Sequence, residues 1–274
     1  MRRFHISFIL LGLIFMANTF ITSKPTLYII GDSTVKNGKG NGAGDLWGWG
    51  EPIVQYFDTT KITVANRALG GTSSRTFQTK GLWKGVLDKI KKGDYVLMQF
   101  GHNDGGALND SSRARGTIKG IVEDSVEIDN ILTKQHEVVH SFGWYLRKMV
   151  RETKAKGGIP VIITPIPRND WEKGKIKRTP NSYPDWAMEV AKQEKIQFVD
   201  LNKAMSDKLD MVGENQVTGK YFFSRDHTHT TAEGALLNAS LVVEGIKGLK
   251  GCKLKRLLLE NPKIVFPVVN KAGN

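Results

Sequence analysis

Cysteine is almost absent from this sequence. Cys252 is the only cysteine among 274 residues, so a disulfide within the chain is excluded, as is a cysteine cage for zinc or an iron–sulfur cluster. Repeats and low-complexity tracts are also missing. The composition, 40% apolar and 24% charged, excludes a disordered, collagen-like or fibrous protein. The length therefore predicts one globular domain that buries most of its apolar surface in a core.

The apolar run near the N-terminus is too short to cross a bilayer as a mature helix. It covers residues 6–17 and follows the positively charged start Met1-Arg2-Arg3, a pattern typical of a secretory signal peptide. We expect a signal peptide over residues 1–23, cleaved near Thr22-Ser23, with an uncleaved anchor as the alternative. The lack of a cysteine there excludes a lipid-anchored lipoprotein. Residues 24–274 would then form a single secreted or periplasmic domain, without stable membrane insertion.

Acidic residues are fewer than basic ones. The 40 lysines and arginines against 27 aspartates and glutamates give a net charge of +13, and the chain stays strongly basic without its first residues. A basic surface attracts polyanions, although it also serves solubility alone. Because an exported protein rarely meets nucleic acid, we expect an acidic glycan as partner and no nucleic acid.

Short apolar runs alternate with helical patterns along the chain. Most of these runs are continuous rather than alternating, which is typical of strands covered on both faces of a parallel sheet. The pattern predicts an α/β fold, a three-layer α/β/α sandwich with a mostly parallel, flavodoxin-like sheet. The expected strands are residues 26–30, 62–66, 95–100, 160–164 and 197–200. The expected helices are residues 83–91, 137–156, 186–195 and 232–249. Residues 38–50 and 105–134 fit no element and are expected to be long loops.

Glycine and polar side chains follow the first three expected strands. Ser33 comes after the first, Gly70-Gly71 after the second and Asn103 after the third. In open α/β sheets, ligands bind outside the carboxyl ends of the strands, so these segments are expected to meet in one crevice. They supply a hydroxyl, backbone N–H groups and an amide, which are the parts of a nucleophile and an oxyanion hole.

A serine nucleophile needs a base, and a histidine near the C-terminus can provide one. Asp226 precedes His229 by three positions, so the two side chains share a side in a turn-like backbone. The carboxylate can then hold one imidazole nitrogen while the other faces Ser33. We therefore expect Ser33, His229 and Asp226 to form a catalytic triad.

Taken together, these blocks resemble the SGNH (GDSL-type) hydrolases over nearly the whole mature chain. Longer strings are similar to the rhamnogalacturonan acetylesterase branch of that family. These strings are Gly31-Asp32-Ser33-Thr34, Trp49-Gly50-Glu51, Gly101-His102-Asn103-Asp104-Gly105-Gly106 and Asp226-His227-Thr228-His229-Thr230. By this resemblance Ser33 is the nucleophile, completed by Asp226 and His229. The oxyanion hole would be the backbone N–H groups of Ser33 and Gly71 with the Asn103 amide.

The resemblance implies a secreted carbohydrate esterase that removes O-acetyl groups from an acidic plant polysaccharide, the rhamnogalacturonan of pectin, by Ser-His-Asp acyl transfer. No metal or cofactor is implied, and we expect a monomer. Two alternatives stay open at this point. One is the same chemistry on another ester, such as acetylated xylan or a lipid. The other is a glycan-binding module without catalysis.

Two side chains near the expected site are candidates for substrate binding. Trp49 lies in a glycine-rich stretch and either stacks on a sugar face or covers the core. Arg75 follows the oxyanion glycine and pairs either with a uronic carboxylate or within a surface salt bridge. Residues 109–135 match no known block, so no substrate contact is assigned there.

A competing motif is His136-Glu137-Val138-Val139-His140, which has the H-E-x-x-H spacing of a zinc metalloprotease helix. Histidines at i and i+4 share a helix face, and the glutamate would serve as base. The third histidine of the longer motif is replaced by Leu146. A zinc metalloprotease is therefore kept only as a remote alternative.

Overall fold

The computed structural model describes residues 24–36, 46–224 and 226–266. The expected signal peptide and most of the glycine-rich stretch at 38–50 lie outside the described residues. No helix within the described ranges is long and apolar enough to cross a membrane.

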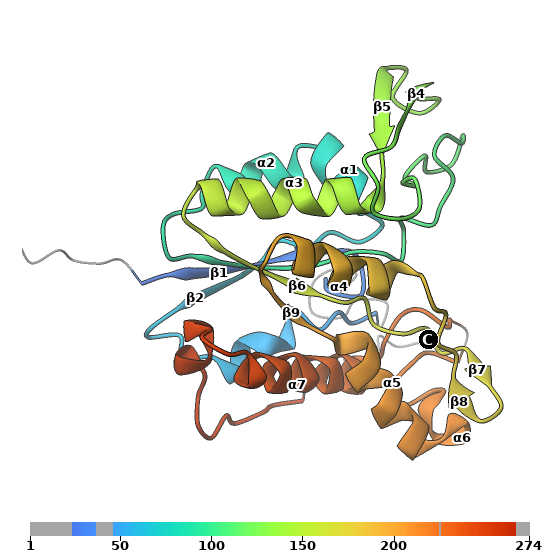
Figure 1. The fold of residues 1–274 in the computed structure, drawn as a ribbon. Helices are drawn as coiled ribbons and strands as arrows, with labels where there is room; N and C mark the ends of the chain where they lie inside the picture. Colours follow the sequence, from blue (N-terminus) through green and yellow to red (C-terminus); the bar gives the residue numbers. More distant parts are fainter. Residues whose placement is uncertain (1–23, 37–45, 225, 267–274) are drawn as a thin grey trace, which may run out of the picture.

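A five-stranded sheet forms the centre of the molecule (Figure 1). Its strand order is β2-β1-β3-β6-β9, and all four neighbouring pairs are parallel. Both faces of the sheet are covered, which explains why β3 is buried at every position and reads as a continuous apolar run. The five expected strands are confirmed as β1 (Thr26–Gly31), β2 (Thr63–Asn66), β3 (Tyr95–Gln99), β6 (Ile159–Ile163) and β9 (Gln197–Val199).

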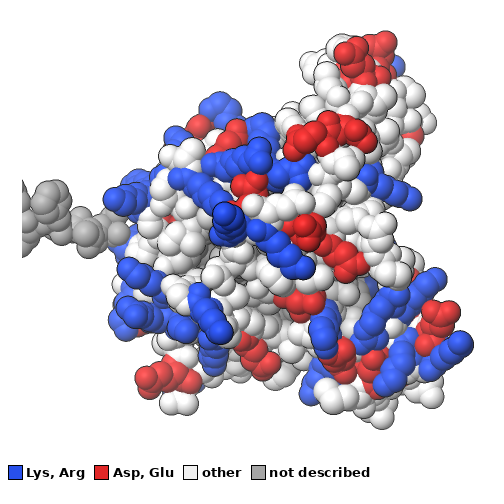
Figure 2. Space-filling model, viewed as in Figure 1, with Lys and Arg blue, Asp and Glu red and all other residues white. Residues whose placement is uncertain are grey.

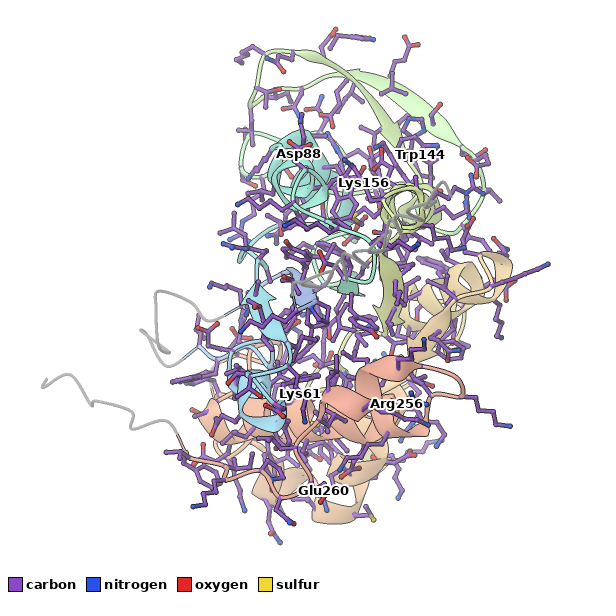
Figure 3. All side chains as sticks on the ribbon, turned by 90° about the vertical axis from the view of Figure 1, so that its left-hand side faces the viewer. Lys61, Asp88, Trp144, Lys156, Arg256 and Glu260 are labelled. Carbon is purple, nitrogen blue, oxygen red and sulfur yellow. The ribbon has the colours of Figure 1, made fainter. Side chains whose placement is uncertain are left out.

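Helices cover the sheet on both faces and complete the expected three-layer α/β/α sandwich (Figure 1). One face carries α1 (Ser74–Thr79), α2 (Leu82–Leu87), α3 (Phe142–Ala155) and α4 (Tyr183–Gln193). The other face carries η1 (Pro52–Tyr56), α5 (Leu201–Val212) and α7 (Ala232–Gly248), with the short α6 (Glu214–Val217) and η2 (Lys253–Leu257) nearby. Figure 3 turns the molecule by a right angle, with Asp88, Trp144 and Lys156 on one side and Lys61, Arg256 and Glu260 on the other.

Alternate residues of each strand serve the two halves of the core. Ile29 of β1 packs in the cluster that includes the α5 and α7 side chains. Ile30, its neighbour, packs in the cluster that includes the α1 and α3 side chains. Successive side chains of a strand point to opposite faces, so one strand contributes to both layers. The fixed sheet then holds the loops at its carboxyl edge in defined places.

The helix expected over residues 137–156 is wrong in its first part. Residues His136–His140 form strand β5, paired antiparallel with β4 (Ser125–Asp129). The helix starts only at Phe142, where the Ser141 side chain accepts a hydrogen bond from the Trp144 backbone and caps it. The two β-branched valines of this segment fit a strand better than a helix.

Other differences are smaller. The loop expected over residues 105–134 contains strand β4, and α2 is shorter than the helix expected over residues 83–91. Helices α1 and α5 were not anticipated, nor was the small hairpin of β7 (Trp171–Glu172) and β8 (Lys175–Ile176). The helices expected over residues 186–195 and 232–249 correspond to α4 and α7.

Candidate active site

Ser33 lies in the turn that directly follows β1. The backbone N–H groups of Val35 and Lys36 donate to the Asp32 carbonyl at 3.2 and 3.0 Å. The Asp32 carboxylate accepts from the Thr34 backbone and hydroxyl at 2.8 and 2.7 Å. These bonds fix the turn and leave the Ser33 side chain half-buried at its outer surface. Asp32 therefore holds the loop and is not the partner of the histidine.

A buried chain of hydrogen bonds supports this turn from below. The Trp49 indole N–H donates to Gln99 Oε1 at 2.8 Å, and Gln99 Nε2 donates to Thr34 Oγ1 at 2.6 Å. Trp49 is fully buried, so the expectation that it contacts substrate is wrong. Because its indole is enclosed, no sugar face can stack on it. Through these two hydrogen bonds, Trp49 and Gln99 support Thr34, the residue next to Ser33.

His229 bridges Ser33 and Asp226. Its Nε2 lies 2.8 Å from Ser33 Oγ, and its Nδ1 lies 2.5 Å from Asp226 Oδ2. The second oxygen, Asp226 Oδ1, accepts from the backbone N–H groups of Thr228 and His229 at 2.6 and 3.1 Å. The structure thus brings together three side chains from opposite ends of the sequence, in the order that a hydroxyl, a base and an orienting carboxylate require.

The charge of Asp226 suits this arrangement. Partial burial raises its pKa, but the hydrogen bonds from the His229 ring and from the Thr228 and His229 backbone outweigh burial. The net pKa of Asp226 is therefore below its ordinary value. The carboxylate is ionised at neutral pH and can stabilise an imidazolium at His229.

The donors expected for the oxyanion hole are the Asn103 amide and the backbone N–H groups of Ser33 and Gly71. The Asn103 amide is buried and uses one hydrogen to donate to the Thr72 carbonyl at 2.7 Å, and its second hydrogen has no acceptor among the described residues. Within the described part of the chain, the backbone N–H groups of Ser33 and Gly71 donate to no protein acceptor. Gly71 has a φ of +79°, a conformation that favours glycine. The three expected oxyanion donors are therefore all free to meet a ligand oxygen.

Asp104, next to Asn103, holds its segment in place, a role that the sequence did not predict. It is fully buried, and its Oδ1 accepts from the Ser74 backbone N–H at 3.0 Å and from the Ser74 hydroxyl at 2.5 Å. Burial raises the pKa of Asp104 to about 7, although the bonds from Ser74 oppose this. These bonds tie the segment that carries Asn103 to the start of α1.

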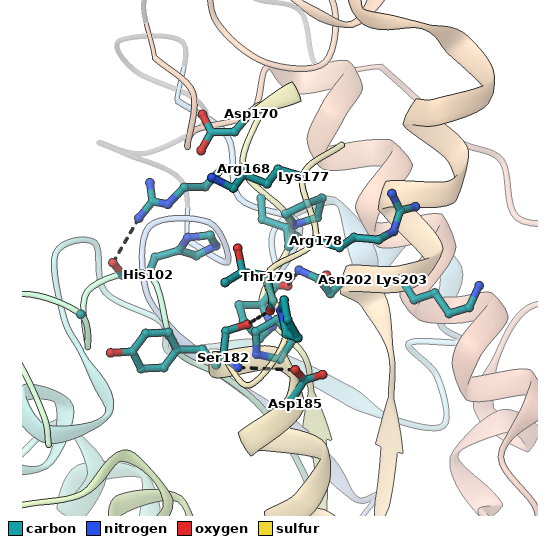
Figure 4. A pocket seen from close by; sticks show the side chains of 18 of the residues that line it. His102, Arg168, Asp170, Lys177, Arg178, Thr179, Ser182, Asp185, Asn202 and Lys203 are labelled. Carbon is teal, nitrogen blue, oxygen red and sulfur yellow. Dashed lines mark hydrogen bonds between the residues drawn. The ribbon is translucent and has the colours of Figure 1, made fainter. Parts of the chain in front are cut away.

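Two cavities adjoin these residues. The smaller, of about 540 Å³, is bounded by Asp226 to His229 and by Asn169, Phe223 and Ser224. The larger, of about 870 Å³, is lined partly by Gly105 and Arg115. Figure 4 shows this cavity from close by, with His102 and Arg168 among the labelled residues that line it. Arg168 links the two, since it donates to the Thr228 hydroxyl and, at 3.4 Å, to the His102 carbonyl. No local signal in the sequence marked Arg115 or Arg168.

The expectation that Arg75 binds substrate is also wrong. The side chain is fully buried, and its Nε and Nη2 donate to the two carboxylate oxygens of Glu137 at 2.7 and 2.6 Å. Its Nη1 donates to the carbonyls of Leu108 and Gly116 at 2.7 and 2.9 Å. Since the side chain is enclosed and all three guanidinium nitrogens donate inside the protein, Arg75 cannot reach a uronic carboxylate.

The zinc alternative fails on backbone geometry. His136 and His140 lie on strand β5 and not on a helix, which separates them by about 13 Å along the chain, too far for one zinc ion. Glu137 is engaged with Arg75. No group of three or more histidine, cysteine, aspartate or glutamate side chains suited to a metal ion occurs among the described residues.

A parallel sheet with hydrogen-bonded serine, histidine and aspartate side chains at its carboxyl edge is an arrangement typical of serine hydrolases. The chain belongs to the GDSL-like lipase/acylhydrolase family, whose model matches residues 29–237. It is therefore a carboxylic ester hydrolase.

Relatives over most of the chain carry esterase names. The sequence is 30% identical over 221 residues to a rhamnogalacturonan acetylesterase of Emericella nidulans, covering 81% of this chain and 84% of that one. It is 28% identical over 242 residues to the rhamnogalacturonan acetylesterase RhgT of Bacillus subtilis, covering 84% and 92%.

Solved structures share the fold. The protein YxiM of Bacillus subtilis superposes with a TM-score of 0.67 at 28% identity, covering 84% of this chain, which spans 58% of the YxiM chain. The acetylxylan esterase Axe2 of Geobacillus stearothermophilus superposes with a TM-score of 0.55 at 18% identity, covering 83% and 96%. The second likeness shows the fold alone.

Proposed function

We propose that this chain is an esterase that removes O-acetyl groups from acidic plant polysaccharide, the rhamnogalacturonan of pectin, by acyl transfer through Ser33. The observation that carries the proposal is the 2.8 Å contact between Ser33 Oγ and His229 Nε2, with the far side of the ring held by Asp226. A base at this distance can take the hydroxyl proton as the oxygen attacks.

In the proposed reaction, Ser33 Oγ attacks the acetyl carbonyl carbon and His229 Nε2 accepts the serine proton. The carbonyl electrons move onto the oxygen, which receives hydrogen bonds from Asn103 and from the Ser33 and Gly71 backbone. The intermediate collapses, the sugar oxygen leaves with the proton from His229, and an acetyl group stays on Ser33. Water, deprotonated by His229, then attacks this ester, Ser33 Oγ leaves with the proton from His229, and acetate is released. The route uses no metal or cofactor.

The choice of substrate rests on two supports. The relatives in Emericella nidulans and Bacillus subtilis are named as rhamnogalacturonan acetylesterases. The net charge of +13 favours a polyanionic substrate, and Figure 2 shows lysine and arginine side chains spread over the visible face, with acids among them. Export and removal of residues 1–23, and action as a monomer, are part of the proposal and rest on the sequence pattern and the family resemblance.

The test is acetate release from acetylated rhamnogalacturonan compared with acetylated xylan of equal acetyl content. We expect kcat/KM to be at least about tenfold higher on rhamnogalacturonan, equivalent to about 1.4 kcal/mol of transition-state binding. The Ser33→Ala variant serves as the blank for both polymers. An equal rate on the two polymers, or a preference for xylan, would contradict the proposed substrate.

A further inference from the structure

Arginine and lysine side chains line the larger cavity, and most of them are already engaged. Arg178 contacts Asp207 and Asp210 at 2.8 and 2.9 Å, and Lys203 also pairs with Asp207. Arg168 donates to a hydroxyl and a carbonyl of the active-site loops. Among the described residues, Arg115 donates only to one backbone carbonyl, and no carboxylate lies within ion-pair distance of it. Asp32, Asp104 and Asp110 act on its charge only from further away. A half-buried cation without a direct ion pair can bind an anionic group of a ligand.

Arg115 lies at the rim of the expected oxyanion hole. Its Nη1 donates to the Gly71 carbonyl at 3.1 Å and lies 3.8 Å from where a Cβ on Gly71 would be. A Cβ on the preceding residue, Gly70, would lie 3.6 Å from the Ser33 Cβ. The two glycines thus stand between the nucleophile and the guanidinium, so that a ligand held by Arg115 is adjacent to the reacting centre.

The Nε–Nη2 edge of the Arg115 guanidinium has no hydrogen-bond acceptor among the described residues. Nη1 is the one nitrogen of Arg115 with an acceptor in the described ranges, so the Nε and Nη2 hydrogens have none. This is the edge that forks onto a carboxylate with two parallel hydrogen bonds. The buried Arg75 shows the same edge in use, since its Nε and Nη2 hold the two oxygens of Glu137. Arg115 lines the cavity, and the same edge of its guanidinium has no acceptor among the described residues.

Close packing and hydrogen bonds hold the backbone around Arg115 in place. The next residue, Gly116, packs so tightly that a Cβ there would lie 1.9 Å from the Gly106 carbonyl oxygen. Its own carbonyl accepts from Arg75 at 2.9 Å, and the Thr117 N–H donates to the Asp104 carbonyl at 2.9 Å. The loop is therefore tied both to α1 and to the segment that carries Asn103, which pre-organises Arg115 for binding.

We propose that the Nε–Nη2 edge of Arg115 binds the carboxylate of a uronate sugar next to the acetylated sugar. The inference rests on the proposed function and deepens it, because it assigns the recognition of the acidic glycan to one side chain. It also gives a role to the segment 109–135, which no sequence block explains.

The experiment compares native acetylated rhamnogalacturonan oligosaccharides with the same oligosaccharides after chemical reduction of their carboxylates. We expect the unaltered enzyme to prefer the native form by at least about tenfold in kcat/KM. Arg115→Gln should reduce this preference to within about twofold, mainly through a higher KM on the native form. The matched control is Arg113→Gln, which removes an equal charge from an exposed side chain of the same loop that does not line the cavity. Its preference should equal that of the unaltered enzyme.

A purely structural role for Arg115 predicts a different effect of Arg115→Gln on the two substrates. Loss of the bond to Gly71 alone would lower kcat equally on native and reduced substrates and leave the preference intact, which would overturn the inference. Should Arg115→Gln not fold, Arg115→Lys retains the charge but not the fork and should still lower the preference by about threefold or more. An unaltered preference in folded Arg115→Lys would overturn the inference as well. Equal activity of the unaltered enzyme on both forms refutes the carboxylate site alone, whereas no release from either form refutes the proposed function together with it.

Discussion

Replacing Ser33 by alanine is expected to lower kcat for p-nitrophenyl acetate hydrolysis by about 10⁴- to 10⁶-fold, because the nucleophile is lost while the donors and the base remain. The fold should survive, since the Ser33 side chain is half-buried and, among the described residues, its hydroxyl forms a hydrogen bond only with His229. A single hydrogen bond of this kind contributes about 1 kcal/mol. The measurement is steady-state kcat together with the thermal unfolding midpoint of each protein.

A serine elsewhere provides the control for that experiment. Ser111 is exposed and lies outside both cavities, so Ser111→Ala should retain full activity. Near-normal turnover in folded Ser33→Ala would rule out acyl transfer through this hydroxyl.

The second large effect concerns stability. Arg75→Met is expected to lower the free energy of unfolding by about 3–5 kcal/mol, the range for removing one partner of a buried ion pair. The change leaves Glu137 without its cation and the Leu108 and Gly116 carbonyls without a donor. Urea unfolding followed by tryptophan fluorescence measures it. Removing both charges in Arg75→Met/Glu137→Leu should recover part of the loss, because the uncompensated carboxylate is then gone.

An exposed ion pair gives the comparison for Arg75. Lys84 and Asp88 lie 2.6 Å apart with side chains 74% and 56% exposed, so Lys84→Met should change the unfolding free energy by less than about 1 kcal/mol. If Arg75→Met lowered the free energy of unfolding as little as Lys84→Met, the Arg75 guanidinium would not stabilise the loop between β3 and β4.

The sheet could be predicted from the sequence because its strands are covered on both faces. Residues such as those of β3 have no solvent side, so their apolar run is continuous and short, unlike the pattern of an amphipathic helix. The placement of the segments that carry Ser33 and Asn103 follows from the same topology. Gly31 and Gln99 pair directly in β1 and β3, and the segments after two neighbouring parallel strands start side by side.

The errors arose where local sequence says little about burial. Trp49 and Arg75 stand close to the site along the chain, but the side chains turn inward to Gln99 and Glu137. Those partners are 50 and 62 residues away, so no local pattern identifies them. The segment of His136 was misassigned for a related reason, since five residues with two valines are too few to separate a strand from the start of a helix.

Arg115 was missed because its position depends entirely on distant contacts. Its segment has no regular apolar period, and the bonds that fix its loop come from Arg75 and from the Asp104 backbone. Only the folded chain places it beside Gly71.

The most direct test of the account is to react the protein with a fluorophosphonate, which forms a stable bond with an activated serine hydroxyl, and to map the labelled peptide by mass spectrometry. We expect one equivalent of label on Ser33, loss of esterase activity in proportion to labelling, and little labelling in His229→Ala, where the hydroxyl has no base. Labelling of a different serine with loss of activity, or full activity with Ser33 completely labelled, would contradict it.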